Sequence, residues 1–441
     1  MNIIKALLFL FLTTFAFTAR ADSGDILLPK GAKVAYQAKV NGKLCQLYKG
    51  RLYVDGKYTF LKTGKPLRNF GSKKECERFI AEDLPVIKEK GFNNLVLNCY
   101  WHQFDRDGDG TIDVDTAPLK AVIDKINELG MFASIAVETY GVGGGTIPKQ
   151  FFKRFPDAIA IDSTGKKCID DEYGKGTAVP SLFDKNYLKA TRLYIANLAR
   201  ALADKDILNF ESTVEPQYIG NKTLDFSPAA RKAYKEYIQN NAIPAPEMPA
   251  EYPVSREFLD SPVFGIFLAE NLGDWVSQDI KAFKDAYKKP VFAAVDYLDA
   301  LEETMRNRMG NPEIFLASLK DVQIIQVNWS WHLKTRSPND KAYARVRAIN
   351  RILNRNWAIS EHMTLNGSDF RGAETPALLK NTIKSSTNYG WDFTDIFNKG
   401  RFCVYENNWR PKDPMKEVDE NFDDYLAEIY DTVKAKTDKG Q

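Results

Sequence analysis

Two glutamates, Glu215 and Glu361, have the type and the position that chemistry on a substrate requires. Each closes a short run of apolar and β-branched residues just before a turn, in Asn209–Glu215 and Trp357–Glu361. Pro216 has no backbone N–H with which to extend a strand, so the first run should end at Glu215. Carboxylates at the carboxyl ends of barrel strands face the loops that converge on a substrate. The two glutamates therefore predict a paired-carboxylate active site.

The predicted strands determine on which side of its strand each glutamate lies. Because side chains alternate along a strand, Glu215 should share a face with Glu211 and Thr213, and Glu361 should share one with Trp357. Both carboxylates could then point into the mouth of one barrel. The alternative for either glutamate taken singly is a surface residue or an ion-pair partner of a nearby arginine.

Strand and helix patterns alternate along most of the chain. Helical patterns cover Glu75–Lys90, Ala117–Leu129, Lys185–Ala203, Ala229–Gln239, Leu268–Tyr287 and Lys341–Leu353. Strand patterns cover Leu67–Phe70, Asn93–Tyr100, Met131–Val137, the run ending at Glu215, Val291–Val295, Val322–Trp329, Trp357–Glu361 and Asp392–Phe397. This alternation predicts an α/β fold, a (β/α)8 TIM barrel, with Glu215 at the end of strand 4 and Glu361 at the end of strand 7.

The segments outside the barrel have signatures of their own. Residues 1–21 have a basic start, an apolar run from Ala6 to Ala19 and the pattern Ala19-Arg-Ala21, which predict a signal peptide and a secreted or periplasmic protein. Turn signals such as Asn41-Gly42 in residues 22–65 predict a short N-terminal β-hairpin flap. The barrel is assigned to residues 66–412, and a C-terminal helix and tail to residues 413–441.

Composition limits the class of partner. The chain has 441 residues, 44% of them hydrophobic, and a net charge of +3 without a basic block, so nucleic acid is not an expected partner. After the signal no run is long and apolar enough to predict an integral membrane segment. The five cysteines are scattered and do not predict a disulfide framework.

Polar and aromatic residues at the predicted mouth are candidates for binding substrate. They are Trp101 and His102 after strand 2, Glu138 after strand 3, and Asn328, Trp329 and Trp331 at the end of strand 6. Tryptophan suits the C–H face of a sugar, although packing within the loops is an equal alternative for each ring. No histidine pair has the spacing of a metal site.

Asp105, Asp107, Asp109 and Asp113 place oxygens at alternate positions around a Gly-rich turn. This spacing matches the first half of a calcium loop, but Thr116 occupies the position where a bidentate Glu belongs. A structural calcium ion and a plain Asp/Gly-rich turn both remain open.

Several segments resemble glycoside hydrolase family 42 β-galactosidases. Phe155-Pro-Asp-Ala-Ile-Ala-Ile-Asp162-Ser-Thr-Gly165-Lys resembles a family segment that reads roughly P-E-I-L-A-V-D-x-x-G-R, and Val179–Tyr187, Phe226–Tyr234 and Ile359-Ser-Glu361 resemble later segments in order. The resemblance covers roughly residues 66–400. It implies a retaining β-glycosidase that needs no cofactor, with Glu215 as acid/base and Glu361 as nucleophile.

This chain departs from the family pattern at defined places. Val214 stands where the family has the Asn that contacts the sugar 2-hydroxyl, and no trimerisation domain, β-sandwich domain or Cys-rich zinc cluster has a counterpart. Galactose specificity is therefore not carried over, and the expected substrate is a β-linked glycan or oligosaccharide. A non-catalytic glycan-binding barrel and a transglycosylase with the same glutamates are the alternatives.

Overall fold

The computed structural model describes residues 27–59, 61–66, 68–89, 92–140, 146–170, 176–220, 222–298, 308–328, 340–363 and 402–407. The expected signal peptide, the candidate strand Asp392–Phe397 and the C-terminal helix and tail lie outside these residues. The described part of the chain has no helix long and apolar enough to cross a membrane.

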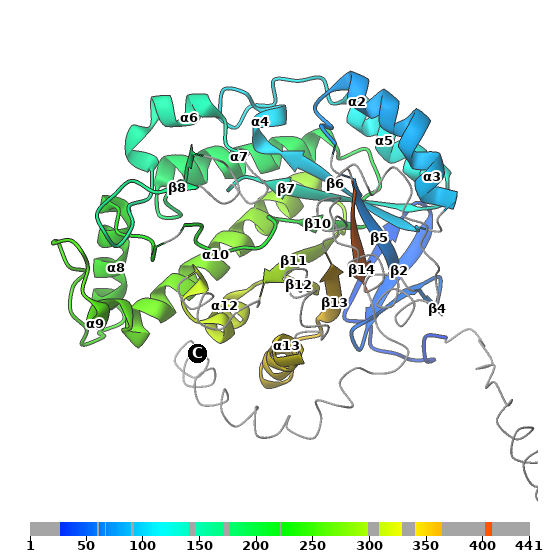
Figure 1. Cartoon of the computed structure of the whole chain (residues 1–441). Helices are drawn as coiled ribbons and strands as arrows, with labels where there is room; N and C mark the ends of the chain where they lie inside the picture. Colours follow the sequence, from blue (N-terminus) through cyan, green and yellow to red (C-terminus); the bar gives the residue numbers. More distant parts are fainter. Residues whose placement is uncertain are drawn as a thin grey trace, which may run out of the picture.

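Strands close into a barrel at the centre of the molecule (Figure 1). In ring order they are β10(Asn209–Glu211), β11(Phe292–Leu298), β12(Ile324–Asn328), β13(Ala358–Met363), β14(Phe402–Asn407), β5(Leu61–Pro66), β6(Asn94–Tyr100) and β7(Phe132–Glu138). All neighbours pair in parallel except β14, which is antiparallel to both β13 and β5. The predicted α/β fold with a curled parallel sheet is confirmed. The described barrel is closed by the antiparallel strand β14 and not by an eighth parallel strand.

Strand 1 of the prediction is wrong in position. Leu67–Phe70 was expected to open the barrel, but the first barrel strand is Leu61–Pro66, inside the segment assigned to the flap. This strand contains Gly64, two lysines and a terminal proline, so it lacks the β-branched and aromatic pattern by which strands are recognised. Pairing with β6 and β14, which is not local in sequence, determines its conformation.

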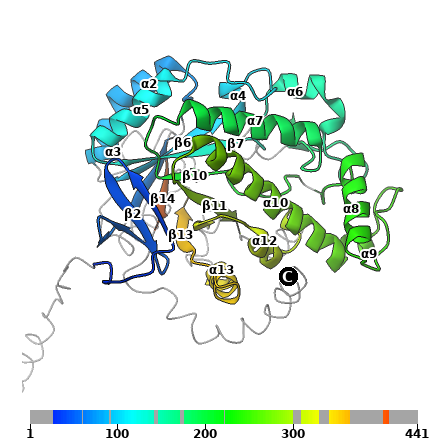
Figure 2. The ribbon, with the colours of Figure 1, turned by 180° about the vertical axis from the view of Figure 1, so that it is seen from behind.

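Helices surround the strands (Figures 1 and 2). In chain order the helical elements are α2(Lys73–Arg78), η1(Phe79–Asp83), α3(Leu84–Glu89), α4(Trp101–Phe104), α5(Ala117–Glu128), α6(Lys149–Arg154), η2(Pro156–Ala158), α7(Lys185–Ala201), α8(Pro228–Asn240), α9(Arg256–Leu259), α10(Pro262–Tyr287), α12(Pro312–Ser318) and α13(Asp340–Ile352). Local signals start several of them: Asp184 accepts from the N–H groups of Asn186 and Tyr187 at the start of α7, and Ser227 caps α8 beside a proline. The predicted bounds of α5, α7, α8 and α13 agree with these within a few residues.

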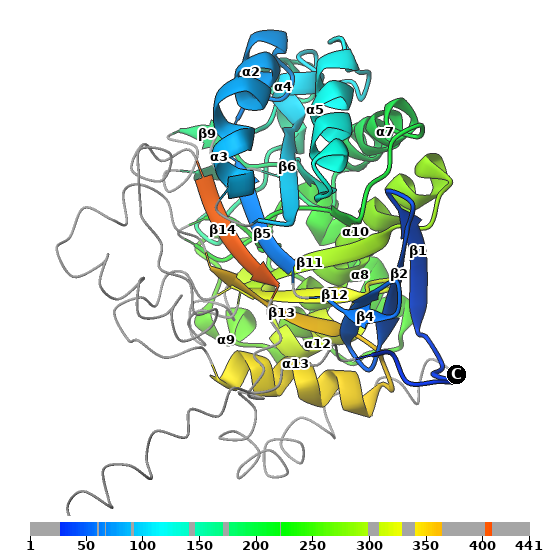
Figure 3. The same cartoon turned by 90° about the vertical axis from the view of Figure 1, so that its right-hand side faces the viewer.

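The segment before the barrel forms a four-stranded antiparallel sheet of β1(Tyr36–Val40), β2(Lys43–Tyr48), β3(Arg51–Val54) and β4(Lys57–Tyr58). Its first turn, Asn41-Gly42, has φ of 51° and 74°, the left-handed pair that a tight hairpin requires. Figure 3 shows the sheet beside one end of the barrel.

This sheet, which we call the plug, seals the amino-terminal end of the barrel. Plug side chains such as Val40 and Leu47 pack with residues at the starts of barrel strands, among them Phe132, Leu208 and Phe292. The hydroxyl of Tyr36 donates to the carbonyl of Val291 at 2.8 Å. The sheet therefore packs at the end of the barrel opposite the expected mouth.

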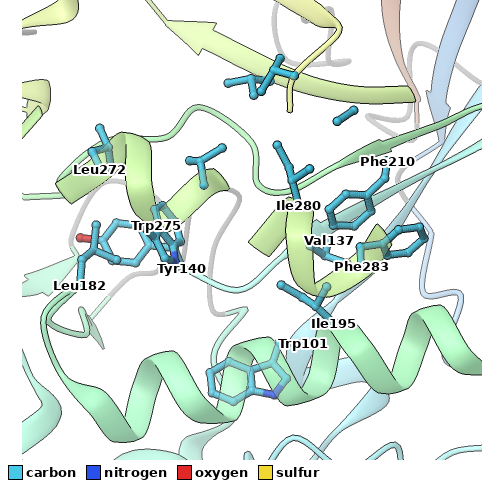
Figure 4. Packing of buried hydrophobic residues seen from close by; sticks show 14 of the residues in the cluster. Trp101, Val137, Tyr140, Leu182, Ile195, Phe210, Leu272, Trp275, Ile280 and Phe283 are labelled. Carbon is cyan, nitrogen blue, oxygen red and sulfur yellow. The ribbon is translucent and has the colours of Figure 1, made fainter. Parts of the chain in front are cut away.

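A larger core fills the space between the strands and the helices. Outward-facing strand residues such as Ile135, Phe210 and Val295 pack there against α5, α7 and α10. Figure 4 shows part of this packing, with Phe210 beside Phe283 of α10. A short hairpin of β8(Ile169–Asp170) and β9(Thr177–Ala178) lies in the long connection between β7 and α7.

Candidate active site

Glu215 lies in the turn that follows β10, four residues beyond the last strand residue, Glu211. Its exposed fraction is 4%, and its φ of 49° places it in the left-handed region. The strand is thus shorter than predicted, because β10 pairs with its neighbours only through Asn209–Glu211. The prediction that Glu211, Thr213 and Glu215 share one strand face is wrong, since alternation does not extend beyond Glu211.

Glu138, the last residue of β7, holds the segment in front of Glu215. Its carboxylate accepts from the Thr213 hydroxyl at 3.1 and 3.2 Å, from the Val214 N–H at 3.0 Å and from the Tyr140 N–H at 3.0 Å. The side chain is fully buried. Glu138 was predicted to bind substrate, and the described contacts turn its carboxylate toward protein donors.

The barrel interior beneath Glu215 is polar. The Lys65 ammonium lies 3.0 Å from a carboxylate oxygen of Glu211, and both side chains are at most 1% exposed. One layer deeper, a chain of hydrogen bonds joins β5, β6, β7 and β10 through Thr63, Asn94, Ser134 and Asn209. Asp296 of β11 and Gln326 of β12 are also fully buried. Sequence reasoning missed these residues; for Asp296 the signal was an acidic residue near the end of strand 5.

Glu361 lies within β13, three strands around the ring from β10. Its register partners are Val327 of β12 and Glu406 of β14. Trp357 packs in the larger core between the strands and the helices. Ala358 packs in the cluster that the plug forms with the starts of the barrel strands. Trp357, which was predicted to share a strand face with Glu361, lies just before β13, and the direction of the Glu361 side chain stays a prediction.

Trp101 and His102 follow β6 as expected, but they differ in environment. Trp101 is fully buried: its Nε1 donates to Asp105 at 2.7 Å, and its ring lies 6.2 and 6.5 Å from the rings of Tyr187 and Tyr194. Figure 4 shows it beside α7. Trp101 therefore packs inside the protein, which was the alternative to contact with a sugar. His102 is partly buried, and burial lowers the pKa of its imidazole, which leaves the neutral ring as the form available to a ligand.

The other expected sugar-binding residues follow β12. Asn328 is the last residue of that strand and pairs in register with His362 of β13. Trp329 and Trp331 lie outside the described residues.

The Asp-rich loop after α4 binds its own backbone. The carboxylate of Asp105 is buried and accepts from the N–H groups of Gly108, Asp109 and Gly110 as well as from Trp101. Asp113 accepts from the Arg106 N–H at 2.7 Å, and Asp109 accepts from the Thr111 N–H at 2.8 Å. Within the described residues, no group of three or more His, Cys, Asp or Glu side chains could hold a metal ion.

Two loops interlock at the mouth beside Glu215. The connection after β7 and the connection after β10 exchange hydrogen bonds from the Ser163 N–H to the Thr223 carbonyl and from the Phe226 N–H to the Ile161 carbonyl. Asp225 accepts from the Ile161 and Ser227 N–H groups, and burial raises the pKa of its carboxyl despite these donors. These contacts join the connections after β7 and β10 into one hydrogen-bonded unit.

Comparison with solved structures places this fold beside β-galactosidases. The cold-adapted β-galactosidase from Rahnella sp. R3 matches with a TM-score of 0.51 at 11% identity, over 71% of this chain and 46% of that enzyme. The β-galactosidase from Bacillus circulans sp. alkalophilus matches with a TM-score of 0.47 at 14% identity, over 69% and 44%. A catalytic mutant of Gan42B, a GH42 β-galactosidase from G. stearothermophilus, matches with a TM-score of 0.48 at 13% identity, over 67% and 43%.

These similarities concern the fold. This chain spans less than half of the length of the enzymes it matches. No protein-family model and no curated relative matches the sequence. The first of the three supports a barrel fold shared with that enzyme.

Proposed function

We propose that this protein is a retaining glycoside hydrolase that cleaves a β-linked glycan or oligosaccharide. The observation that carries the proposal is the place of Glu215: a buried carboxylate, held at the carboxyl end of strand 4, in a barrel whose fold is shared with a β-galactosidase. A second glutamate, Glu361, lies on strand 7 of the same ring. The fold alone does not assign a reaction, so the proposal rests on these two positions.

In the proposed reaction the two glutamates act in turn. Protonated Glu215 donates its proton to the glycosidic oxygen while the Glu361 carboxylate attacks the anomeric carbon, which releases the first product and forms a glycosyl ester. The Glu215 carboxylate then takes a proton from water as that water attacks the anomeric carbon and frees Glu361. Val214 packs against the core and cannot hydrogen-bond the sugar through its side chain, so a 2-deoxy substrate should lose less rate than in an enzyme with Asn there.

The test begins with a panel of chromogenic β-glycosides and then compares two variants. Glu361→Ala should lose turnover by several orders of magnitude and form no covalent adduct. Glu215→Ala should still be glycosylated by substrates with a good leaving group, and azide should rescue it with a β-glycosyl azide product. Glu128→Gln, an exposed change on α5, should behave as the parent protein.

Two outcomes would contradict this mechanism. One is wild-type turnover in both Ala variants on a confirmed substrate. The other is a crystal structure with the two carboxyl groups more than about 9 Å apart, because a retaining pair lies about 5–5.5 Å apart and even an inverting pair stays near or below that limit. A protein that binds sugars in the panel without turning any over would instead be a glycan-binding barrel.

We also propose that the protein is exported. The proposal rests on the basic start at Lys5, the apolar run that follows it and the small residues Ala19 and Ala21. Mass spectrometry of the secreted or periplasmic protein should find Asp22 at its N-terminus. A cytoplasmic pool that keeps Met1 would contradict export.

A further inference from the structure

Glu215 has a backbone conformation that its own residue type does not favour. A left-handed φ, here 49°, is unfavourable for a residue with a Cβ, because the Cβ comes too close to the following carbonyl oxygen. Such conformations persist where the surrounding structure fixes them, and they are concentrated at functional sites. The residues directly before Glu215 are therefore where the fixing contacts should be sought.

Those contacts come from Glu138. The Thr213 hydroxyl lies within hydrogen-bond distance of both carboxylate oxygens. Oε2 accepts from the Val214 N–H, and Oε1 accepts from the Tyr140 N–H. Thr213 and Val214 are the two residues before Glu215, and Tyr140 belongs to the connection after β7. One buried carboxylate thus joins the ends of strands 3 and 4.

We infer that Glu138 is a positioning residue, which holds Thr213 and Val214 so that the Glu215 carboxyl group stands where a leaving group departs. This inference rests on the function proposed above. Its structural part, the bracing of residues 213–215, is separate from any reaction and can be tested alone.

The chemistry of the contacts explains why a carboxylate is needed. Two backbone N–H groups and one hydroxyl point at Glu138, one N–H at each oxygen. In Glu138→Gln the amide would place an NH₂ group against the Val214 or the Tyr140 N–H, so one buried donor would face another. Gln has nearly the same volume as Glu, so the change tests the hydrogen bonds and not the packing.

The first arm of the experiment is hydrogen exchange. In Glu138→Gln the amide of Val214 should exchange about tenfold faster or more, the ratio expected when one buried hydrogen bond is lost. Thr213→Val should loosen the same segment by removing its hydroxyl donor, whereas Thr213→Ser keeps that donor and should restore protection. Amides of α5 serve as an internal reference, and Glu128→Gln is the exposed control.

The second arm is kinetic and uses two aryl β-glycosides of one sugar. With a 4-methylphenyl leaving group, which needs a proton, kcat/KM of Glu138→Gln should fall by about 10²-fold, the lower range of general acid catalysis. With a 2,4-dinitrophenyl leaving group, which needs none, kcat/KM should change little, because this ratio reports the glycosylation step and not the later attack of water that Glu215 assists as a base. A merely destabilised protein would lose activity equally on the two substrates.

The outcomes separate the two proposals. Unchanged exchange at residues 213–215 in both Glu138→Gln and Thr213→Val overturns the positioning role, as does an equal kinetic loss with both leaving groups. If exchange accelerates but neither Glu215→Ala nor Glu361→Ala affects turnover, the bracing stands and the proposed function fails. If Glu138→Gln does not fold, Thr213→Val carries both arms.

Discussion

Three buried carboxylates of this protein are held in two different ways. Glu211 pairs with Lys65, whereas Glu138 and Asp105 accept N–H and hydroxyl groups. The difference matters because a buried ion keeps its charge only when a partner offsets the loss of water. Removing either member of the buried Lys65–Glu211 pair should therefore lower the stability of the fold by a measurable amount.

We expect Lys65→Met to destabilise the fold by about 3–5 kcal/mol, since it leaves the Glu211 charge buried without its ammonium partner. Glu211→Leu should cost a similar amount by stranding Lys65. The double variant should recover most of the loss, because an apolar pair of similar volume has no charge to bury. Urea unfolding of the four proteins measures the coupling; single costs that simply add would contradict the argument.

At the scale of elements, α7 and α10 meet around a buried acid. Asp279 of α10 is fully buried, its nearest cation is the Arg192 side chain at 3.7 Å, and Tyr187 of α7 lies nearby. That separation allows an ion pair but no hydrogen bond. Burial raises the pKa of Asp279 to about 7, and Arg192 offsets only part of this effect.

The raised pKa predicts a pH-dependent stability with a definite sign. Between about pH 4 and pH 7 the folded protein holds a proton on Asp279 that the unfolded chain has released, so stability should fall as pH rises through this window and level off above it. The total change is on the order of a few kcal/mol, since each pKa unit is worth about 1.4 kcal/mol. Asp279→Asn should flatten this slope in urea unfolding, whereas Asp274→Asn, an exposed change on the same helix, should not.

The Asp-rich loop is the other element with a prediction. Because the Asp105 carboxylate already accepts hydrogen bonds from the loop and from Trp101, we expect millimolar calcium or a chelator to leave the melting temperature unchanged. Asp105→Ala should destabilise by about 1–3 kcal/mol or more, the cost of stranding buried donors. A calcium-dependent rise in the melting temperature would restore the metal-binding alternative.

At the scale of the whole molecule, elements that depend on contacts within one turn could be predicted from the sequence, and elements that depend on distant strand pairing could not. Asp184 and Pro228 mark helix starts through contacts within one turn, so those helices could be predicted. Leu61–Pro66 becomes a strand only by pairing with β6 and β14, and its lumen-facing Lys65 hides the strand pattern.

In the candidate site, too, the position of a residue could be predicted locally, whereas its distant partners could not. Glu215 could be located from Pro216 and the preceding strand pattern, although the strand ends earlier than its residue types suggest. Glu138 could be identified as a residue of the site but not as a partner of Val214, and Lys65 could not be identified at all, because Lys65 is 146 residues from Glu211 and Glu138 is 76 residues from Val214. Pairing over such distances depends on the closed barrel, which no short pattern encodes.

The plug has a practical consequence for how the protein can be attached to a surface. Leu27, the first described residue, bridges to Lys57 of β4, so the chain enters the fold on the plug, at the end of the barrel opposite Glu138 and Glu215. A tether joined ahead of Leu27 would anchor the molecule by the plug and leave the end that carries Glu138 and Glu215 away from the surface. Immobilisation on a bead or a fusion to a carrier at that side should therefore leave the proposed activity the same as in the untethered protein.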